Sequence, residues 1–226
     1  MAYKSIIISC EHAGNVVPEK HQSLFTGAQE VLNSHRGWDP GALEVASYLA
    51  DQFRVPLSAM NVTRLLIEMN RSLDSATIFS EFTENLSAED RSALISEYYL
   101  PYHKALDTTI QQSRKPVLHL SVHSFTTVLN EITRLVDVGI LFDPACIQER
   151  KFCEHVKKIL DHRLPDITTL FNEPYKGTDD GIATIMRKKF PGNDYLGIEI
   201  ELNQKFVDTP TLGSIGEALY QAIRSV

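Results

Sequence analysis

The sequence predicts an α/β fold of three layers, in which helices cover both faces of a mostly parallel mixed sheet. Apolar stretches of strand length alternate along the chain with stretches in which apolar residues recur at helical spacing. The first of them, residues 5–10, holds three consecutive isoleucines, which is typical of a strand buried on both faces of a parallel sheet. No repeat or linker interrupts the 226 residues, and this predicts a single domain over 1–226.

Each further element follows from periodicity and from its end signals. Apolar residues at positions 42, 45, 46, 49 and 53 predict a helix there. The helix predicted at 87–112 opens on Ser87 with Asp90 three residues on, pauses at Pro101 and is stopped by Pro116. In chain order after the opening strand, we expect a helix at 42–53, strands at 55–59 and 65–69, a helix at 87–112, strands at 117–124 and 139–142, a helix at 145–162, a strand at 167–171, a helix at 181–189, a strand at 195–202 and a helix at 214–226.

Composition restricts the possible partners. The net charge of −7 disfavours nucleic acid and anionic membranes, because no basic face offsets the excess of carboxylates. No apolar run approaches the length of a membrane span, and the start of the chain does not resemble a signal peptide. Three unevenly spaced cysteines indicate a reducing compartment rather than a disulfide framework. We therefore expect a cytoplasmic protein that binds neither nucleic acid nor membrane, and the oligomeric state is left open.

Polar side chains lie on strand faces that helices are expected to shield from water. Residues 117–124 alternate, so that His119, Ser121 and His123 share one face of their strand. Glu199 and Glu201 do the same on the strand at 195–202. A buried carboxylate must be paired, protonated, bound to a metal or placed at the open end of the sheet. The alternative is an edge strand whose polar face is solvated.

The strand ends predict a metal site. His12, His123 and Glu199 each lie at or near the carboxyl end of a predicted core strand, and a parallel sheet gathers such ends into one crevice. Two imidazoles and a carboxylate are the ingredients of a catalytic Zn²⁺ site, in which a nearby glutamate accepts the proton of the attacking water. We therefore predict Zn²⁺ as the cofactor.

Two arginines predict recognition of a small acid. Arg64 and Arg71 flank the apolar residues 65–69, and Asn70 lies beside the second arginine. A guanidinium binds a carboxylate through two parallel hydrogen bonds, which suits a small-molecule carboxylate substrate. The alternative is a pair of surface ion pairs with Glu68 or Asp74.

Two further segments allow more than one interpretation. The turn-rich loop at 172–181 either caps the following helix or lines a pocket with Tyr175 and Gly177. Cys10, next to Glu11 and His12, is either a nucleophile with a neighbouring base or an inert buried thiol. Consecutive strand residues point to opposite faces, so Cys10 and Glu11 do not converge, and this favours the inert thiol.

Several motifs together are similar to one known family. They are Cys10–Asn15 with Pro18, His35–Ala42, Arg64–Arg71, Ser121–Phe125, Asn172–Gly177 and Gly197–Ile200. In this order, over nearly the whole chain, they resemble the N-formylglutamate amidohydrolase family. The resemblance implies a zinc-exopeptidase-like α/β/α fold and hydrolysis of an N-acyl amino acid, in the prototype N-formyl-L-glutamate.

A more distant resemblance, to aspartoacylase, succinylglutamate desuccinylase and the zinc carboxypeptidases, implies roles for single residues. In the two acylases a His-x-x-Glu pair and a later histidine hold zinc. His12 and His123 match this pattern, but Asn15 stands in the place of the glutamate. The third ligand is then Glu11 or, as the second choice, Asp39. Glu199 matches the general base, and the resemblance assigns no role to Glu201.

The resulting hypothesis is a zinc-dependent amidohydrolase. Glu11, His12 and His123 would hold the metal, Glu199 would be the general base, and the substrate would be bound by Arg64, Asn70, Arg71, Tyr175 and Gly177. Two alternatives remain open. One is a non-catalytic protein of the same fold that binds small acids, and the other is a thiol hydrolase that uses Cys10.

Overall fold

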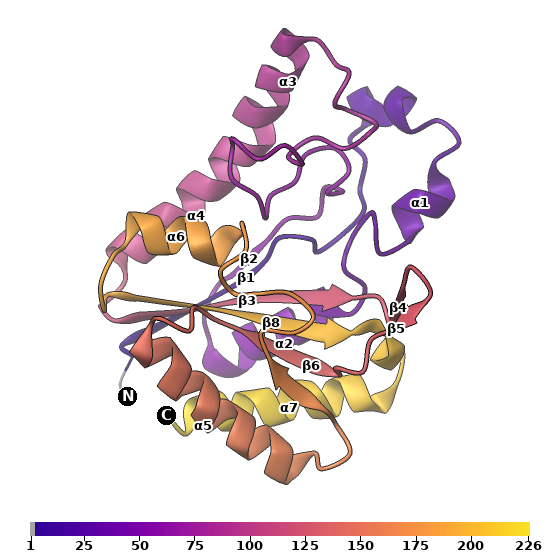
Figure 1. Cartoon of the computed structure of the whole chain (residues 1–226). Coiled ribbons are helices and arrows are strands. Elements are labelled where there is room, and N and C mark those ends of the chain that lie inside the picture. Colours follow the sequence, from indigo (N-terminus) through magenta and orange to yellow (C-terminus); the bar gives the residue numbers. More distant parts are fainter. Residues whose placement is uncertain (1–2) are drawn as a thin grey trace.

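The computed structural model describes residues 3–226 and has a central six-stranded sheet between two layers of helices (Figure 1). The strands follow the order β2-β1-β3-β8-β6-β7, and β6 runs antiparallel to β8 whereas the other pairs are parallel. The predicted three-layer, mostly parallel mixed fold is confirmed. The sheet is formed by β1 (Ser5–Cys10), β2 (Leu57–Ala59), β3 (Val117–Phe125), β6 (Val138–Leu141), β7 (Thr169–Phe171) and β8 (Tyr195–Asn203).

The helices and the remaining short elements surround this sheet (Figure 1). The α-helices are α1 (Gln29–Asn33), α2 (Ala42–Phe53), α3 (Ala88–Leu94), α4 (Leu100–Gln112), α5 (Ile147–Arg163), α6 (Ile182–Lys189) and α7 (Pro210–Arg224). A hairpin of β4 (Val128–Leu129) and β5 (Ile132–Thr133), two 3₁₀ turns (Glu19–Phe25 and Gln204–Phe206) and a π-helical turn (Ile95–Tyr99) complete the chain.

The two faces of the sheet differ in their partners. On one face Leu118, Leu120 and Val122 of β3 belong to the large apolar core that the sheet shares with α2, α5 and α7. On the other face α4 and α6 cover a smaller apolar cluster, to which β3 contributes Val117, and beyond it β3 presents the polar residues His119 and His123. The polar face of β3 is therefore buried beneath helices, and the solvated edge strand considered above is excluded for β3 and β8.

Register brings the polar residues of neighbouring strands together. Ser121 pairs with Glu199 and His123 with Glu201 in the parallel β3–β8 ladder. His12 follows β1, which lies on the other side of β3. These residues therefore share the edge of the sheet at which the parallel strands β1, β3 and β8 end.

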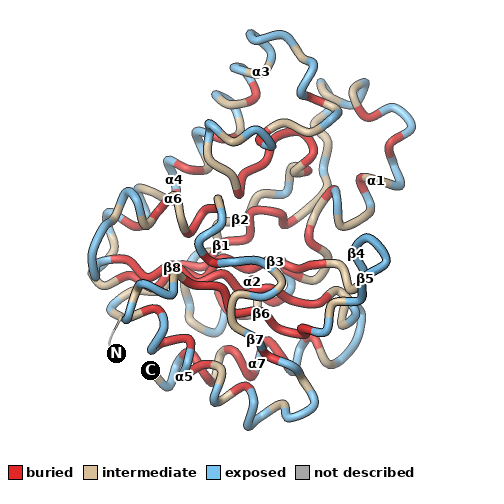
Figure 2. The backbone as a smooth tube through the Cα atoms, viewed as in Figure 1, coloured by how far each residue is buried: buried red, intermediate tan, exposed pale blue. Residues whose placement is uncertain are grey.

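The prediction of a strand at 65–69 is wrong. This segment forms turns, with the Leu66 N–H donating to the Thr63 carbonyl at 3.0 Å and the Glu68 N–H donating to the Ile78 carbonyl at 2.9 Å. Its apolar residues pack in a separate cluster beyond the sheet, which also contains Phe25, and Figure 2 shows this buried stretch in red among paler loops. A short run of apolar residues indicates only that the segment is buried. A buried loop therefore produces the same sequence pattern as a buried strand.

The other boundaries shift by a turn or less, for local reasons. Ser87 caps α3 as predicted, because its hydroxyl accepts a hydrogen bond from the Asp90 N–H at 3.0 Å. The predicted pause falls just before Pro101, in the π-helical turn, and the proline occupies the first turn of α4, where its missing N–H costs nothing. The last helix begins at Pro210 for the same reason. None of the helices in residues 3–226 is both long and apolar enough to cross a membrane.

Candidate active site

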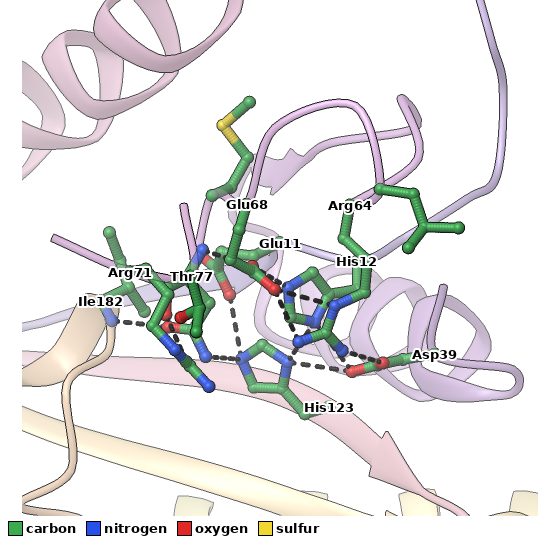
Figure 3. A network of polar contacts seen from close by, with 12 residues as sticks. Glu11, His12, Asp39, Arg64, Glu68, Arg71, Thr77, His123 and Ile182 are labelled. Atoms are coloured by element: carbon green, nitrogen blue, oxygen red, sulfur yellow. Dashed lines mark hydrogen bonds and ion pairs between the residues drawn. The ribbon is translucent and has the colours of Figure 1, made fainter. Parts of the chain in front are cut away.

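Three side chains from separate parts of the chain converge where β1 and β3 end. His12 follows β1, Asp39 lies in the loop before α2, and His123 is near the end of β3. Asp39 Oδ2 lies 3.1 Å from His12 Nδ1 and 3.0 Å from His123 Nδ1, and the two Nδ1 atoms are 3.2 Å apart. All three residues are buried, and Figure 3 shows both rings beside the Asp39 carboxylate. The three atoms therefore face one common point.

This donor set fits a divalent metal ion. Two imidazole nitrogens and one carboxylate oxygen form a known type of catalytic zinc site, which keeps a fourth position open. A tetrahedral site with metal–ligand distances of about 2.0–2.1 Å separates neighbouring ligand atoms by about 3.3 Å. The observed separations of 3.0 to 3.2 Å are close to this value. Within residues 3–226 this triad is the only group of three or more potential ligands with such spacing.

Asp39 is held as an ionised carboxylate. Its backbone N–H donates to the His12 carbonyl at 3.0 Å, the Ser124 N–H donates to Asp39 Oδ2 at 3.2 Å, and Arg64 Nη1 donates to Oδ1 at 3.2 Å. Burial by itself would raise the pKa of Asp39, but the neighbouring histidines and the Arg64 charge lower it far below its ordinary value. The carboxylate is therefore negatively charged at any working pH, as a metal ligand must be.

Each histidine contacts a second buried carboxylate with the ring nitrogen that faces away from Asp39. His12 Nε2 is bonded to Glu68, and His123 Nε2 lies 3.2 Å from Glu11 Oε2. Glu68 is bonded in turn to Arg64 Nε at 2.8 Å. Each ring therefore lies between Asp39 and an outer carboxylate.

Glu11, the first choice for the third ligand, therefore lies on the far side of His123. Asp39, the second choice, occupies the position between the two Nδ1 atoms. Asn15 lies away from the triad, where its amide nitrogen donates to the Leu32 carbonyl at 3.0 Å. The triad thus contains two of the three predicted ligands, His12 and His123, together with Asp39.

A polar cavity of about 140 Å³ opens beside the triad. Its lining includes the predicted substrate residues Arg64, Asn70, Arg71 and Tyr175 and the predicted base Glu199. Gly177 is not part of the lining. It packs against the residue that follows β6, and a Cβ atom added to it would lie 2.1 Å from the Phe142 nitrogen.

The two arginines of the cavity differ in how they are paired. Arg64 forms ion pairs with Glu68 and Asp39, so the alternative of an ion pair with Glu68 is realised, although inside the site rather than on the surface. Arg71 Nη1 donates to the carbonyls of Asn70 and Asp180, at 2.6 and 3.0 Å, and within residues 3–226 it forms no ion pair. The positive charge of Arg71 is therefore available to an anion in the cavity.

Asn70 connects this arginine to helix α6. Its Oδ1 accepts a hydrogen bond from the Ile182 N–H at 2.5 Å, the first N–H of the helix, and Figure 3 shows Ile182 approaching the same group of side chains. The positive end of the α6 dipole thus points toward the cavity next to Arg71. Both features favour a negatively charged group at this end of the cavity.

Two glutamates of β8 complete the lining. Both are buried, and burial raises the pKa of Glu199 and raises the pKa of Glu201 to about 8. Glu199 Oε1 is close to the start of α6, since a Cβ atom on Gly181 would be 3.5 Å from it. Glu201 Oε2 has no hydrogen-bond partner among the described residues. A carboxyl group with a raised pKa in a cavity is suited to taking and giving a proton near neutral pH.

The loop 172–181 forms one wall of the cavity, as one of the two interpretations expected. Tyr175 is 41% exposed at the rim, and its hydroxyl accepts a hydrogen bond from Arg134 Nη1 at 3.2 Å. Arg187 anchors the loop, because it donates a hydrogen bond to the Gly177 carbonyl at 2.7 Å and is itself held by a buried ion pair with Glu149.

Sequence reasoning missed the place of Glu68 in the site, where it contacts both His12 and Arg64. The sequence analysis considered Glu68 only as a possible surface partner of an arginine. Glu68 is, however, the one acid inside the apolar run 65–69, and an acid in a buried segment needs a partner, which is the signal that could have identified it.

Cys10 is fully buried in the large core, on the face of β1 opposite to the site, and burial raises its pKa well above its ordinary value.

Comparisons with known proteins found one family and two solved structures to which this chain is similar. A family model described as N-formylglutamate amidohydrolase matches residues 4–207. A crystal structure of the gene product Atu2144 from Agrobacterium tumefaciens is 26% identical, with a TM-score of 0.82, and the match covers 98% of this chain and 91% of the other. A metallo-carboxypeptidase from Burkholderia cenocepacia is 11% identical with a TM-score of 0.43, covering 99% of this chain and 57% of the other. No curated protein matches the sequence.

Proposed function

We propose, from the premise that this chain belongs to the N-formylglutamate amidohydrolase family, that it is a metal-dependent hydrolase of a small N-acyl amino acid. The observation that carries the proposal is the His12–Asp39–His123 triad, which lies in one cavity with Glu199 and Arg71. The triad would hold Zn²⁺, with Asp39 in place of Glu11 as the third ligand. The metal supplies Lewis acidity, which polarises the scissile carbonyl and lowers the pKa of the attacking water.

Arg71 is proposed to bind the carboxylate of the substrate. Among residues 3–226 its guanidinium has only carbonyl partners, and the start of α6 adds a second source of positive potential. Asn70 holds these two features together. Anchoring the acid at this end of the cavity places the acyl group toward the triad, so that the amide is oriented for attack. Tyr175 forms the rim beside the bound substrate.

Arg64 has a different proposed role. It is neutralised by Glu68 and Asp39, so it is a weaker anchor for a second anion than Arg71 is. Because it also lines the cavity beside the triad, it is placed to stabilise negative charge that develops on the carbonyl oxygen during attack.

Glu199 is proposed as the general base. As a carboxylate it accepts the proton of the attacking water, and it then passes this proton to the leaving amine. Burial raises its pKa, which makes it a stronger base than an ordinary glutamate and a better acid for the second transfer.

The substrate is a small acid, and N-formyl-L-glutamate is the first compound to test because it is the substrate named in the family description. We also propose a cytoplasmic location, which is supported by the three free cysteines, all of which lie in the described part of the chain.

The test combines metal analysis with a substrate screen. The purified protein should contain about one equivalent of zinc and should hydrolyse N-formyl-L-glutamate or another N-acyl amino acid. His123→Ala should lose both the metal and the activity, whereas the exposed His162→Ala should keep both. Full activity in a metal-free preparation would refute the proposal.

The alternatives predict other outcomes of the same test. Stabilisation of the protein by acyl-amino acids without turnover would indicate a non-catalytic binding protein. Inactivation by alkylation combined with resistance to chelators would indicate the Cys10 thiol hydrolase. Cys10 is buried and lies outside the cavity lining, which argues against a reactive thiol and against access of a substrate to it.

A further inference from the structure

Glu11 is a fully buried carboxylate that neither the ligand triad nor the proposed chemistry uses. We propose that it is a positioning residue, which holds His123 with Nδ1 directed at the metal and the proton on Nε2. The inference rests on the proposed metal site and adds to it a residue that determines how tightly the metal is bound.

The two nitrogens of His123 face different partners. Nδ1 lies 3.0 Å from Asp39 Oδ2 and 3.2 Å from His12 Nδ1, so this nitrogen faces the ligand side. Nε2 lies 2.8 Å from Ser121 Oγ and 3.2 Å from Glu11 Oε2. Glu11 is therefore separated from the ligand side by the imidazole ring itself, and it is absent from the group of atoms that could share one ion.

The hydrogen bonds around Glu11 determine the tautomer. Glu11 Oε2 is 2.6 Å from Ser121 Oγ, and because an ionised carboxylate only accepts, the Ser121 hydroxyl must donate its single proton to it. The lone pairs of Ser121 then face His123 Nε2, which must carry a hydrogen to make that contact. The Asn70 amide nitrogen, itself a donor, is the most distant neighbour of Nε2, at 3.4 Å, so the closer oxygens of Ser121 and Glu11 decide where the proton lies. With the proton on Nε2, Nδ1 presents its lone pair to the metal.

Glu11 is itself held from behind. The Tyr102 hydroxyl donates to Glu11 Oε1 at 2.8 Å, and only 1% of Glu11 is exposed. A buried carboxylate with two hydroxyl donors still needs a positive charge nearby. His123 bound to a metal ion provides it, and the carboxylate in turn makes the imidazole a better ligand. Such outer partners change metal affinity by about 10- to 100-fold.

The test measures metal binding rather than turnover. Zn²⁺ is titrated into the metal-free protein in competition with a chromophoric chelator, and Co²⁺ is added to record the absorption spectrum of the site. Glu11→Gln should weaken Zn²⁺ binding by about 10- to 100-fold and leave the Co²⁺ spectrum unchanged, because the three inner ligands are retained. Tyr102→Phe is the matched control, since it removes one neighbour of Glu11 but keeps the charge, and its effect should be at least several-fold smaller.

Two results would overturn the inference. An unchanged Zn²⁺ affinity in Glu11→Gln would show that the carboxylate does not position His123. A changed Co²⁺ spectrum would show that Glu11 is itself a ligand. Absence of Zn²⁺ binding by the unmodified protein would refute the proposed function as well, so the two failures are distinguishable.

A measurement on the unmodified protein covers the case in which Glu11→Gln does not fold. In the zinc-loaded protein labelled with ¹⁵N-histidine, long-range ¹⁵N–¹H spectra report which ring nitrogen carries the proton. The proton of His123 should reside on Nε2. A proton on Nδ1 would refute the proposed role of Glu11.

Discussion

The two ends of the cavity are built differently. At the triad end, each charged group already has its partners: Asp39 is bonded to two histidines and Arg64, and each histidine has an outer carboxylate. At the substrate end, Arg71 has only carbonyl partners within residues 3–226. The charged groups of the triad are therefore preorganised before anything binds, whereas the substrate end keeps the unpaired charge of Arg71 for a ligand to satisfy.

The largest expected effect is at the triad end, where a single charge holds the site together. Asp39→Asn keeps the shape of the side chain but removes the charge between the two Nδ1 atoms and the partner of Arg64. We expect loss of zinc at micromolar concentrations and loss of activity, measured by metal analysis and a hydrolysis assay. The exposed Asp51→Asn, on α2, is the control. Retention of stoichiometric zinc in Asp39→Asn would mean that the triad is not the metal site.

The next effect separates chemistry from metal binding. Glu199→Gln should keep zinc and lower kcat by about 10²- to 10⁴-fold, the usual contribution of a general base. In the unmodified enzyme kcat should fall toward acid pH, because the base acts as a carboxylate. Burial raises its pKa, so the midpoint should lie above the ordinary value of 4.5. A kcat that is flat from pH 4 to 8, or a fully active Glu199→Gln, would remove Glu199 from this role.

The substrate end should respond through binding. Arg71→Gln removes a charged hydrogen bond to the substrate, which is worth about 1.5–3 kcal/mol, so kcat/KM should fall by about 10- to 150-fold, mainly through KM. Zinc content should not change, because Arg71 does not contact the triad. The comparison variant is Arg36→Gln, at an exposed ion pair with Glu81, for which no change is expected. Loss of zinc in Arg71→Gln would contradict the separation of the two ends.

The last effect concerns the free energy of unfolding rather than activity. Glu201 keeps its proton in the folded protein up to a pKa of about 8, against an ordinary value of 4.5. Between these values the folded state binds more protons than the unfolded state, so the free energy of unfolding falls as pH rises, by up to about 1.4 kcal/mol per pH unit. Glu201→Gln should remove this contribution, as seen in denaturant unfolding of metal-free protein between pH 5 and 9. Glu44→Gln, at an exposed position on α2, should leave it unchanged. If the free energy of unfolding of Glu201→Gln still fell with rising pH, the pH dependence would belong to another group.

Much of the fold and part of the site could be predicted from local patterns. Alternation in residues 117–124 correctly predicted a strand with one apolar and one polar face, and the end signals at Ser87 and Pro116 correctly bounded the helical region between them. The family resemblance is confirmed by the match over residues 4–207. The extent of the domain and the roles of the site residues stay predictions.

The sequence by itself determined that His12, His123 and Glu199 reach the edge of the sheet at which β1, β3 and β8 end. It could do so because the alternation of side chains along a strand and the direction of the strand are local properties. Only the tertiary structure decided how these side chains are paired. Glu11 is next to His12 in the chain but lies behind the His123 ring, while Asp39, from a distant loop, lies between the two imidazoles. Pairing depends on how loops and helices fold back over the sheet, and the spacing of residues along the chain carries no record of that geometry.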